Sequence, residues 1–348
     1  MSRYEVTTRA VRIKLDANEH PYGVVPELRG ELQRALGAVD ASRYPDASSS
    51  GVRALLGRHL GVDADRIVVG SGSNEVMACI ATSVRAEVSQ VVIPCPTFGM
   101  YRVVAGNLDL PVVEVPTDRD FRLEPEAVGR AVSRGSSLVF LCMPNNPTGA
   151  YFPHDCVQAA LDAGARAVVV DEAYGEFGGS SWVEASGRDP RVIVLRTLSK
   201  AFGLAGVRLG YCVAHGEVVG RIDAVRAPYN VGGYSQAAAA VVLERPEVQL
   251  ASVAPVAESI RDMVRELSGI PGLRPFPSCT NFVLFRVDEG AYGMSATELW
   301  EALGDRGISI RRFGGVPELE GHLRVSAGLP EENEEFLAGL RDLGGGER

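Results

Sequence analysis

The chain has 348 residues, of which 46% are hydrophobic, and it carries a formal net charge of −9 at pH 7. This length allows a large buried core, in two domains or in one large α/β domain. The acidic charge argues against nucleic acid or an anionic membrane as a partner, and no apolar run approaches the roughly 18 residues of a membrane-spanning helix.

Neither the start of the chain nor its cysteines indicate export. Met1–Ala10 carries charge and has no apolar segment, so we expect no signal peptide. The six cysteines form no CxxC pair. We therefore expect reduced thiols, no metal site and a cytoplasmic protein.

In chain order, residues 1–30 hold few apolar positions and include the turn-rich segment L-D-A-N-E-H-P-Y-G (15–23), which we interpret as an arm. Helical spacing follows at Glu27–Val39 and again from Gly51, and a further helix is expected at 155–163. Seven short apolar runs then resemble buried strands: Ile67–Val69, Val91–Ile93, Val112–Val115, Leu138–Cys142, Ala167–Val170, Val192–Leu195 and Leu209–Val213. Because helices separate most of them, we predict an α/β fold with a mostly parallel, seven-stranded sheet.

After Arg226 the pattern changes to that of a smaller α+β domain. Helical spacing is found at Tyr234–Leu243, Pro255–Leu267, Ser295–Leu303 and Glu331–Leu343, and strand patterns at 280–287, 308–312 and 322–328. We predict an arm and part of the small domain at 1–38, a large domain at 39–244, and a small C-terminal domain at 245–348.

Polar residues collect just beyond the predicted strands. G-S-G-S-N-E (70–75) lies between a strand and the helix Val76–Val84, a geometry that aims backbone N–H groups at an anion. Asn146 and Asp171 follow two further strands. Since parallel sheets bind ligands at the carboxyl ends of their strands, these residues predict one shared pocket.

The loop between the last two strands of the sheet carries Ser199, Lys200 and Arg208. Of the 35 Lys and Arg residues, only Lys14 and Lys200 are lysines. A desolvated lysine can form a covalent bond with an aldehyde, whereas an arginine cannot. The alternative is a loop lysine that merely extends to solvent, and the surrounding motifs argue against it.

The candidate residues share one chemical theme. Lys200 offers an amine, and Asp171 is a carboxylate that needs a cationic or N–H partner if it is buried. The backbone amides of Ser71–Asn74, together with Ser199 and Arg208, offer an anion cradle. Asn146 and Tyr174 offer hydrogen bonds, and Phe98 offers a ring face. A flat aromatic cation with a phosphate and an aldehyde, as in pyridoxal 5′-phosphate (PLP), fits this set.

Several motifs together resemble the fold-type-I, class II aminotransferases and, within them, the histidinol-phosphate aminotransferase family. They are L-D-A-N-E-H-P-Y-G, R-Y-P-D (43–46), P-N-N-P-T-G (144–149), D-E-A-Y-G-E-F (171–177), the stretch from Leu195 to Tyr211, A-P-Y-N-V (227–231) and L-R-V-S-A-G (323–328). The resemblance runs from about Leu15 to Leu340. One departure is E-H-P-Y-G, where the family usually has E-N-P-Y-G.

The resemblance implies a role for each candidate. Lys200 would bond to PLP and shuttle a proton, Asp171 would pair with the pyridine nitrogen, and Tyr174 with Asn146 would bond the ring 3′-oxygen. Phe98 would stack on the ring. The cofactor phosphate would be held by Ser73, Asn74, Ser199 and Arg208, with Tyr44 from a second subunit of a homodimer.

For the substrate, the resemblance implies contacts from Tyr22, Asn146, Arg311 and Arg324, with Arg312 left at the surface. The implied reaction is the reversible transfer of an amino group from histidinol phosphate to 2-oxoglutarate. Its products are imidazole-acetol phosphate and glutamate. Alternatives are a transaminase for an aromatic amino acid or a secondary-metabolite precursor, and a PLP decarboxylase of a phosphorylated amino acid. A PLP-binding transcription regulator is disfavoured, because the resemblance starts by residue 15 and the charge is acidic.

Overall fold

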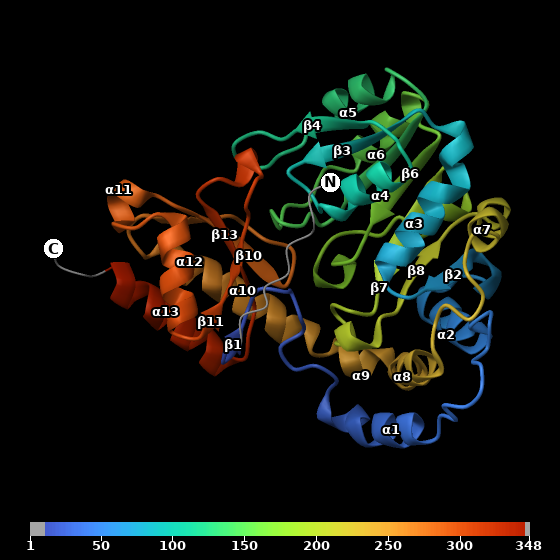
Figure 1. Cartoon of the computed structure of the whole chain (residues 1–348), viewed down its shortest axis with the longest axis horizontal. Coiled ribbons are helices and arrows are strands. Elements are labelled where there is room, and N and C mark those ends of the chain that lie inside the picture. The colour runs from blue at the N-terminus through green and yellow to red at the C-terminus, as the bar shows by residue number, and fades with distance from the viewer. Residues whose placement is uncertain (1–10, 345–348) are drawn as a thin grey trace.

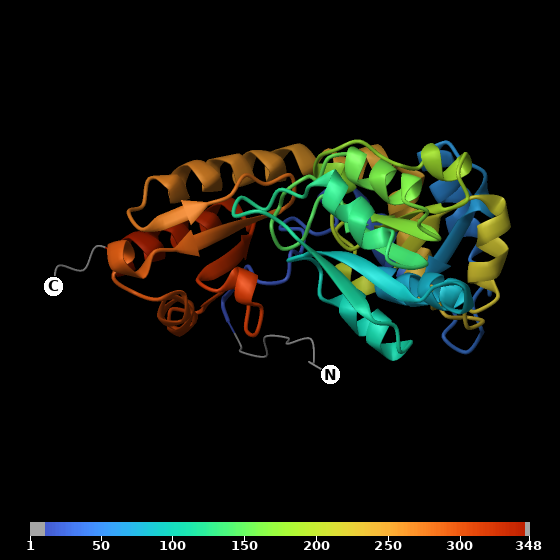
Figure 2. The same cartoon turned by 90° about the horizontal axis from the view of Figure 1, so that it is seen from above.

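The computed structural model describes residues 11–344, so the expectations for Met1–Ala10 lie outside the described residues. The chain forms a larger part around a central sheet and a smaller part made mostly of C-terminal residues (Figure 1). The two parts lie side by side when the molecule is seen from above (Figure 2).

The larger part is built on a seven-stranded sheet with the order β2-β8-β7-β6-β5-β3-β4. Its strands are β2 (Ile67–Gly70), β3 (Gln90–Cys95), β4 (Val112–Pro116), β5 (Ser137–Cys142), β6 (Ala167–Asp171), β7 (Val192–Thr197) and β8 (Gly210–Val213). The strand β8 runs antiparallel to both of its neighbours, β2 and β7, and the other pairs in the sheet are parallel. The predicted mostly parallel sheet is therefore confirmed, and each predicted run lies on a strand.

Alternating side chains of these strands pack into separate cores on the two faces of the sheet, as strand geometry requires. On β5, Leu138 and Phe140 face one core, whereas Val139 and Leu141 face the other. The first face is covered by α3 (Ser73–Val84), α4 (Met100–Asn107) and α7 (Gly216–Asp223). The second is covered by α1 (Pro26–Gly37), α2 (Ser50–Leu60), α5 (Pro125–Val132), α6 (Asp155–Asp162) and α8 (Gly233–Glu244).

Three of these helices, α4, α5 and α7, have no counterpart among the predicted elements. Each has eight residues, about two turns, which leaves little of a 3.6-residue period to detect, although the equally short α6 matches the helix expected at 155–163. Pro125 at the first turn of α5 is a helix-start signal that the sequence does contain.

The smaller part has a four-stranded antiparallel sheet with the order β12-β13-β10-β9. Its elements are β9 (Leu273–Pro275), β10 (Phe282–Val287), β12 (Arg311–Arg312), β13 (His322–Ser326), α11 (Glu289–Tyr292), α12 (Ala296–Asp305) and α13 (Pro330–Gly344). Two helices lead into it, α9 (Pro246–Leu250) and the long α10 (Val253–Ser268), which runs along one edge in Figure 2.

The predicted single strand at 308–312 is wrong in one respect, because it divides between two sheets. Ser309 on β11 (Ile308–Ser309) pairs with Lys14 on β1 (Ile13–Lys14), whereas Arg311 on β12 pairs with Arg324. The arm therefore contributes a short strand to the smaller part, where Ile13 joins the apolar core.

The helix α1 lies with the larger part, since Leu28 belongs to the core that includes α2 and α8. The domain limits near 38 and 244 stay predictions. Between residues 11 and 344, no helix is both long and apolar enough to cross a membrane.

Candidate active site

A cavity of about 300 Å³ lies where the strand ends of the large sheet face the arm and the smaller part. The chain direction explains why the predicted residues meet there. The strands β5, β6 and β7 are parallel and end at this edge, and β8 starts there because it is antiparallel. Eleven predicted residues line the cavity: Ser73, Asn74, Phe98, Asn146, Asp171, Tyr174, Ser199, Lys200, Arg208, Arg311 and Arg324.

Lys200 places its amine between the large sheet and the arm. Its Nζ donates to the backbone oxygens of Ala17 and Asn18, both at 3.1 Å, and lies 5.8 Å from the centre of the Tyr174 ring. Burial lowers the pKa of Lys200 to about 7, and the positive charges of Arg324 and Arg208 act in the same direction. A large share of the amine is therefore neutral near pH 7, as a nucleophile requires.

Asp171, the last residue of β6, is 2% exposed. Its carboxylate accepts from the Tyr101 hydroxyl at 2.8 Å and from the Ala173 amide at 3.0 Å. Burial raises the pKa of Asp171 to about 6, although both of these hydrogen bonds lower it. Within residues 11–344 no ion pair forms at Asp171, so this buried carboxylate fits a cationic ring nitrogen.

This environment predicts a pH dependence for the cofactor-free protein. Because the pKa of Asp171 is higher in the folded than in the unfolded state, its contribution to stability is complete below about pH 4 and lost as pH rises through 6. We expect cofactor-free Asp171→Asn to exceed the wild type in stability by up to about 3 kcal/mol at pH 8. Denaturant unfolding between pH 5 and 8 measures this, and a difference independent of pH would contradict it.

The anion cradle combines a helix start with an arginine. Ser73 and Asn74 begin α3, where the first backbone N–H groups have no partner within the helix. Gly72 has φ +80°, and a Cβ there would lie 2.6 Å from Arg208 Nη2. Only glycine lets the guanidinium come this close to the helix start, and the Ser199 hydroxyl completes the lining. The cradle suits a phosphate.

A second cationic group lies in the same cavity, on the smaller part. Arg324 is 4% exposed and donates to Asn146 Oδ1 at 2.5 Å and to the Asp16 backbone oxygen at 2.9 Å. Arg311 lies directly opposite Arg324 in the β12–β13 pair. Arg312 points away, with its guanidinium 5.0 Å from the centre of the Trp300 ring, so its predicted surface position is confirmed.

Two residues that support the site were not predicted. Asn18 donates from Nδ2 to the Tyr174 hydroxyl at 2.8 Å, and Tyr101 holds Asp171 as described above. Asn18 has φ 55° and is 2% exposed, which fits the tolerance of asparagine for this conformation. The sequence offered one signal for Asn18, its place in the motif L-D-A-N-E-H-P-Y-G, whereas Tyr101 lies on α4, a helix that was not predicted.

Two predicted residues lie outside the cavity lining of their own chain. Tyr44 is 82% exposed and stacks on Tyr229, with 4.6 Å between ring centres. Tyr22 is half-buried against the apolar core of the smaller part, and its amide donates to His20 Nδ1 at 3.3 Å. Their roles stay predictions.

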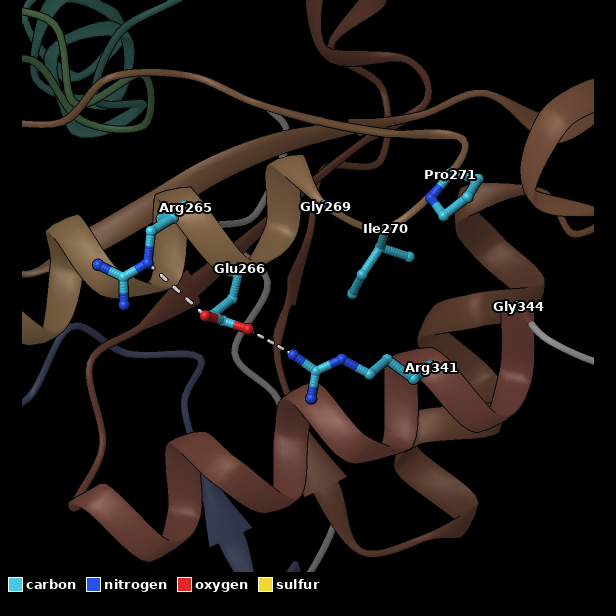
Figure 3. Close-up of a pocket in the computed structure, with 7 residues that line it drawn as sticks. All are labelled: Arg265, Glu266, Gly269, Ile270, Pro271, Arg341 and Gly344. Carbon is cyan, nitrogen blue, oxygen red and sulfur yellow. Dashed lines mark hydrogen bonds and ion pairs between the residues drawn. The ribbon is translucent and has the colours of Figure 1, made fainter.

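A second cavity, of about 490 Å³, lies between α10 and α13 (Figure 3). Although it is larger, its chemistry is that of a surface ion pair: Glu266 pairs with Arg341 at 2.5 Å and with Arg265 at 3.7 Å. Both arginines are more than half exposed. The smaller cavity, with its amine of lowered pKa and its buried carboxylate, is the better candidate for catalysis.

Comparison with known proteins agrees with this geometry. The family model for aminotransferase class I and II matches residues 11–340. Histidinol-phosphate aminotransferase of Thermococcus gammatolerans is 37% identical over 344 residues, covering 99% of this chain and 95% of that protein. The enzyme of that name from Roseiflexus castenholzii is 36% identical over 339 residues, covering 95% and 89%.

A solved structure supports the fold. The crystal structure of histidinol-phosphate aminotransferase from Sinorhizobium meliloti in complex with pyridoxal-5′-phosphate is 28% identical, with a TM-score of 0.85, covering 97% of this chain and 92% of that one. The cradle, the buried carboxylate and the amine described above fit the same cofactor. The chain is thus a member of the aminotransferase class I and II family, with the fold-type-I architecture of PLP-dependent transaminases.

Proposed function

We propose that the protein is a histidinol-phosphate aminotransferase of histidine biosynthesis. It would convert histidinol phosphate and 2-oxoglutarate into imidazole-acetol phosphate and glutamate. The observation that carries this is the pair Arg311 and Arg324 in the same cavity as a separate phosphate cradle. One cradle serves the cofactor, and the second cationic group serves an anionic substrate end. Relatives with this name, 33–37% identical over nearly the whole chain, support the assignment.

PLP, when bound, supplies an aldehyde that bonds to amines and a cationic ring that draws electrons from the adjacent carbon. Lys200 would hold the cofactor and move a proton to and from the substrate carbon. Asp171 would keep the proton on the ring nitrogen, with its own position fixed by Tyr101. Tyr174, held by Asn18, would donate to the ring oxygen together with Asn146. Phe98 would cover the ring face.

For the substrate, Arg324 and Arg311 would bind the phosphate. Asn146 already holds the Arg324 guanidinium in place. Tyr22, which lies in the arm segment 15–23, would contact the substrate as well. A substrate with one carboxylate needs one guanidinium fork, whereas a dianionic phosphate uses both arginines.

We further propose a cytoplasmic homodimer in which Tyr44 reaches the cofactor phosphate of the partner. The support is the exposed pair Tyr44 and Tyr229, whose rings stack on each other, and the half-exposed Tyr234. Large exposed aromatic side chains of this kind are typical of interfaces. Small-molecule amino donors and 2-oxo acids would be the other partners.

Shared sites predict that two crippled variants restore each other. Mixing Lys200→Ala with Tyr44→Ala should give whole sites where wild-type Lys200 meets the intact Tyr44 of the other chain. Random exchange bounds recovery at roughly a quarter of wild-type activity, since half the dimers are mixed with one whole site of two. Tyr44 supplies about 1.5–3 kcal/mol as a hydrogen bond to a charged group, so limiting PLP gives the best contrast.

Subunit exchange itself is verified in that experiment by mass-labelled chains. No recovery despite exchange, or a sedimenting monomer with full activity, would place Tyr44 within its own chain. In either case the shared site would be rejected.

The proposed function is tested in cells. A bacterial strain without its own histidinol-phosphate aminotransferase should grow without histidine when it expresses this chain. Lys200→Ala, expressed at the same level, is the matched control and should not support growth. Absence of growth with the soluble wild-type chain would contradict the proposal.

A further inference from the structure

The two lysines of the chain, Lys14 and Lys200, line the same cavity. The other 33 of the 35 Lys and Arg residues are arginines. Lys200 has a role in the proposed chemistry. Lys14 has none, since the phosphate-binding role falls to Arg311 and Arg324. A lysine differs from an arginine in being a compact charge on a flexible stem, able to change partners without the fixed fork of a guanidinium.

The local strand geometry places Lys14 in the cavity. Ile13 and Leu15 are 2% and 1% exposed in the core of the smaller part. Because neighbouring side chains of a strand point to opposite faces, Lys14 and Asp16 face the cavity. Pairing of Lys14 with Ser309 brings β1 beside the segment that carries Arg311. Lys14, Arg311 and Arg324 therefore line the same cavity, Lys14 from the arm and the two arginines from the paired strands β12 and β13.

Lys14 has one buried and one exposed acidic partner, because the Asp16 side chain is 7% exposed, and only the exposed partner, Glu19, is easily exchanged. The Lys14 Nζ lies 2.6 Å from Glu19 Oε2 and 3.4 Å from Asp16 Oδ1. The Lys14 and Glu19 side chains are about half exposed, at 48% and 50%, and ion pairs so accessible to water contribute little. Desolvation alone would lower the pKa of Lys14, but the contacts with Glu19 and Asp16 outweigh it and raise that pKa. Lys14 thus stays charged in the lining of the cavity.

We propose that Lys14 is a specificity-determining residue that exchanges Glu19 for the phosphate end of the substrate. This inference rests on the proposed function. Arg324 and Arg311 supply two positive charges, and Lys14 adds a third from the side of the arm. A dianionic phosphate gains from this third charge, whereas a substrate without the phosphate does not. Lys14 therefore favours phosphorylated amines over their unphosphorylated counterparts.

The test measures binding without turnover, on PLP-loaded protein in the Lys200→Ala background. Calorimetry gives the Kd of histidinol phosphate and of histidinol, which lacks the phosphate. Lys14→Met should raise the Kd of histidinol phosphate about tenfold. This is the low end for loss of a charge-assisted hydrogen bond, because Lys14 must give up its pair with Glu19 when it binds the phosphate. The affinity for histidinol should change less than about twofold. Lys14→Arg keeps the charge but not the compact, flexible amine, so its affinity for histidinol phosphate should lie between those of Lys14→Met and the unaltered background.

Arg12→Met is the matched control. It removes one positive charge two residues away, but Arg12 pairs with Glu335 on α13 and is not among the residues of the cavity lining. Both ligands should then bind within about twofold of the unaltered background. Glu19→Gln removes the competing partner of Lys14 and should lower the Kd of histidinol phosphate. This variant also tests the exchange of partners if Lys14→Met fails to fold.

The outcomes separate the two proposals. If the background protein does not prefer histidinol phosphate to histidinol, the proposed function fails. If it does, and Lys14→Met keeps that preference while Arg12→Met behaves the same, only the role of Lys14 fails. Weaker binding of histidinol phosphate to Glu19→Gln would likewise overturn the exchange.

Discussion

Replacing Lys200 by alanine should abolish turnover while PLP remains bound without a covalent link. The rate should fall by at least the roughly 10²–10⁴-fold that a positioned acid–base group contributes. The cofactor should stay, because Asp171 and the Arg208 cradle are separate from Lys200 in the cavity. Absorbance of the purified protein measures bound PLP, and a steady-state assay measures the rate.

The attachment point is checked directly on the wild type. Borohydride reduction followed by peptide mass spectrometry should place PLP on Lys200. Lys14 is the natural control, since it is the other lysine and lines the same cavity. Label on Lys14 would show that the catalytic lysine is misassigned.

Replacing Asp171 by asparagine should leave PLP bound but lower the rate by orders of magnitude. A neutral amide cannot hold the proton on the ring nitrogen, so the ring draws electrons less strongly from the substrate carbon. The fold should persist, because the Tyr101 hydroxyl can accept a hydrogen bond as well as donate one. Rapid-mixing absorbance of the half-reaction measures the effect at the step concerned.

Two further variants separate the effect of the charge of Asp171 from that of its hydrogen bond to Tyr101. Asp171→Glu keeps the charge and should retain part of the activity. Tyr101→Phe removes the hydrogen bond to Asp171 while the carboxylate stays, so it should have a smaller effect than Asp171→Asn. A normal rate for Asp171→Asn would make Asp171 a structural strand-end carboxylate.

The sequence predicted the large sheet and most of its ligand-facing residues because the signals are local. The apolar runs of β5, β6 and β7 stop close to the polar residues Asn146, Asp171 and Ser199. Parallel strands place such residues at one edge regardless of details of packing. The resemblance then gave each residue a role that spacing alone could not supply.

Local sequence patterns could not predict contacts between segments that are distant in the chain. Tyr101 meets Asp171 across 70 residues, and Asn18 meets Tyr174 across 156. The divided strand at 308–312 likewise depends on which neighbours pair on each side, which no periodicity encodes. Tyr22 packs beside the apolar core of the smaller part, and its expected contact with the substrate stays a prediction.

The most direct test of the proposed function is the first half-reaction, followed by absorbance as the bound cofactor is converted to its amine form. Candidate amines are offered one at a time to the wild-type enzyme, with Lys200→Ala as the blank. We predict that histidinol phosphate reacts with a kcat/KM at least about a hundredfold above that of histidinol, which lacks the charged group bound by the two arginines. Phenylalanine and phosphothreonine represent the alternative substrates and should react more slowly than histidinol phosphate. Faster conversion by phenylalanine, or no conversion by histidinol phosphate, would contradict it.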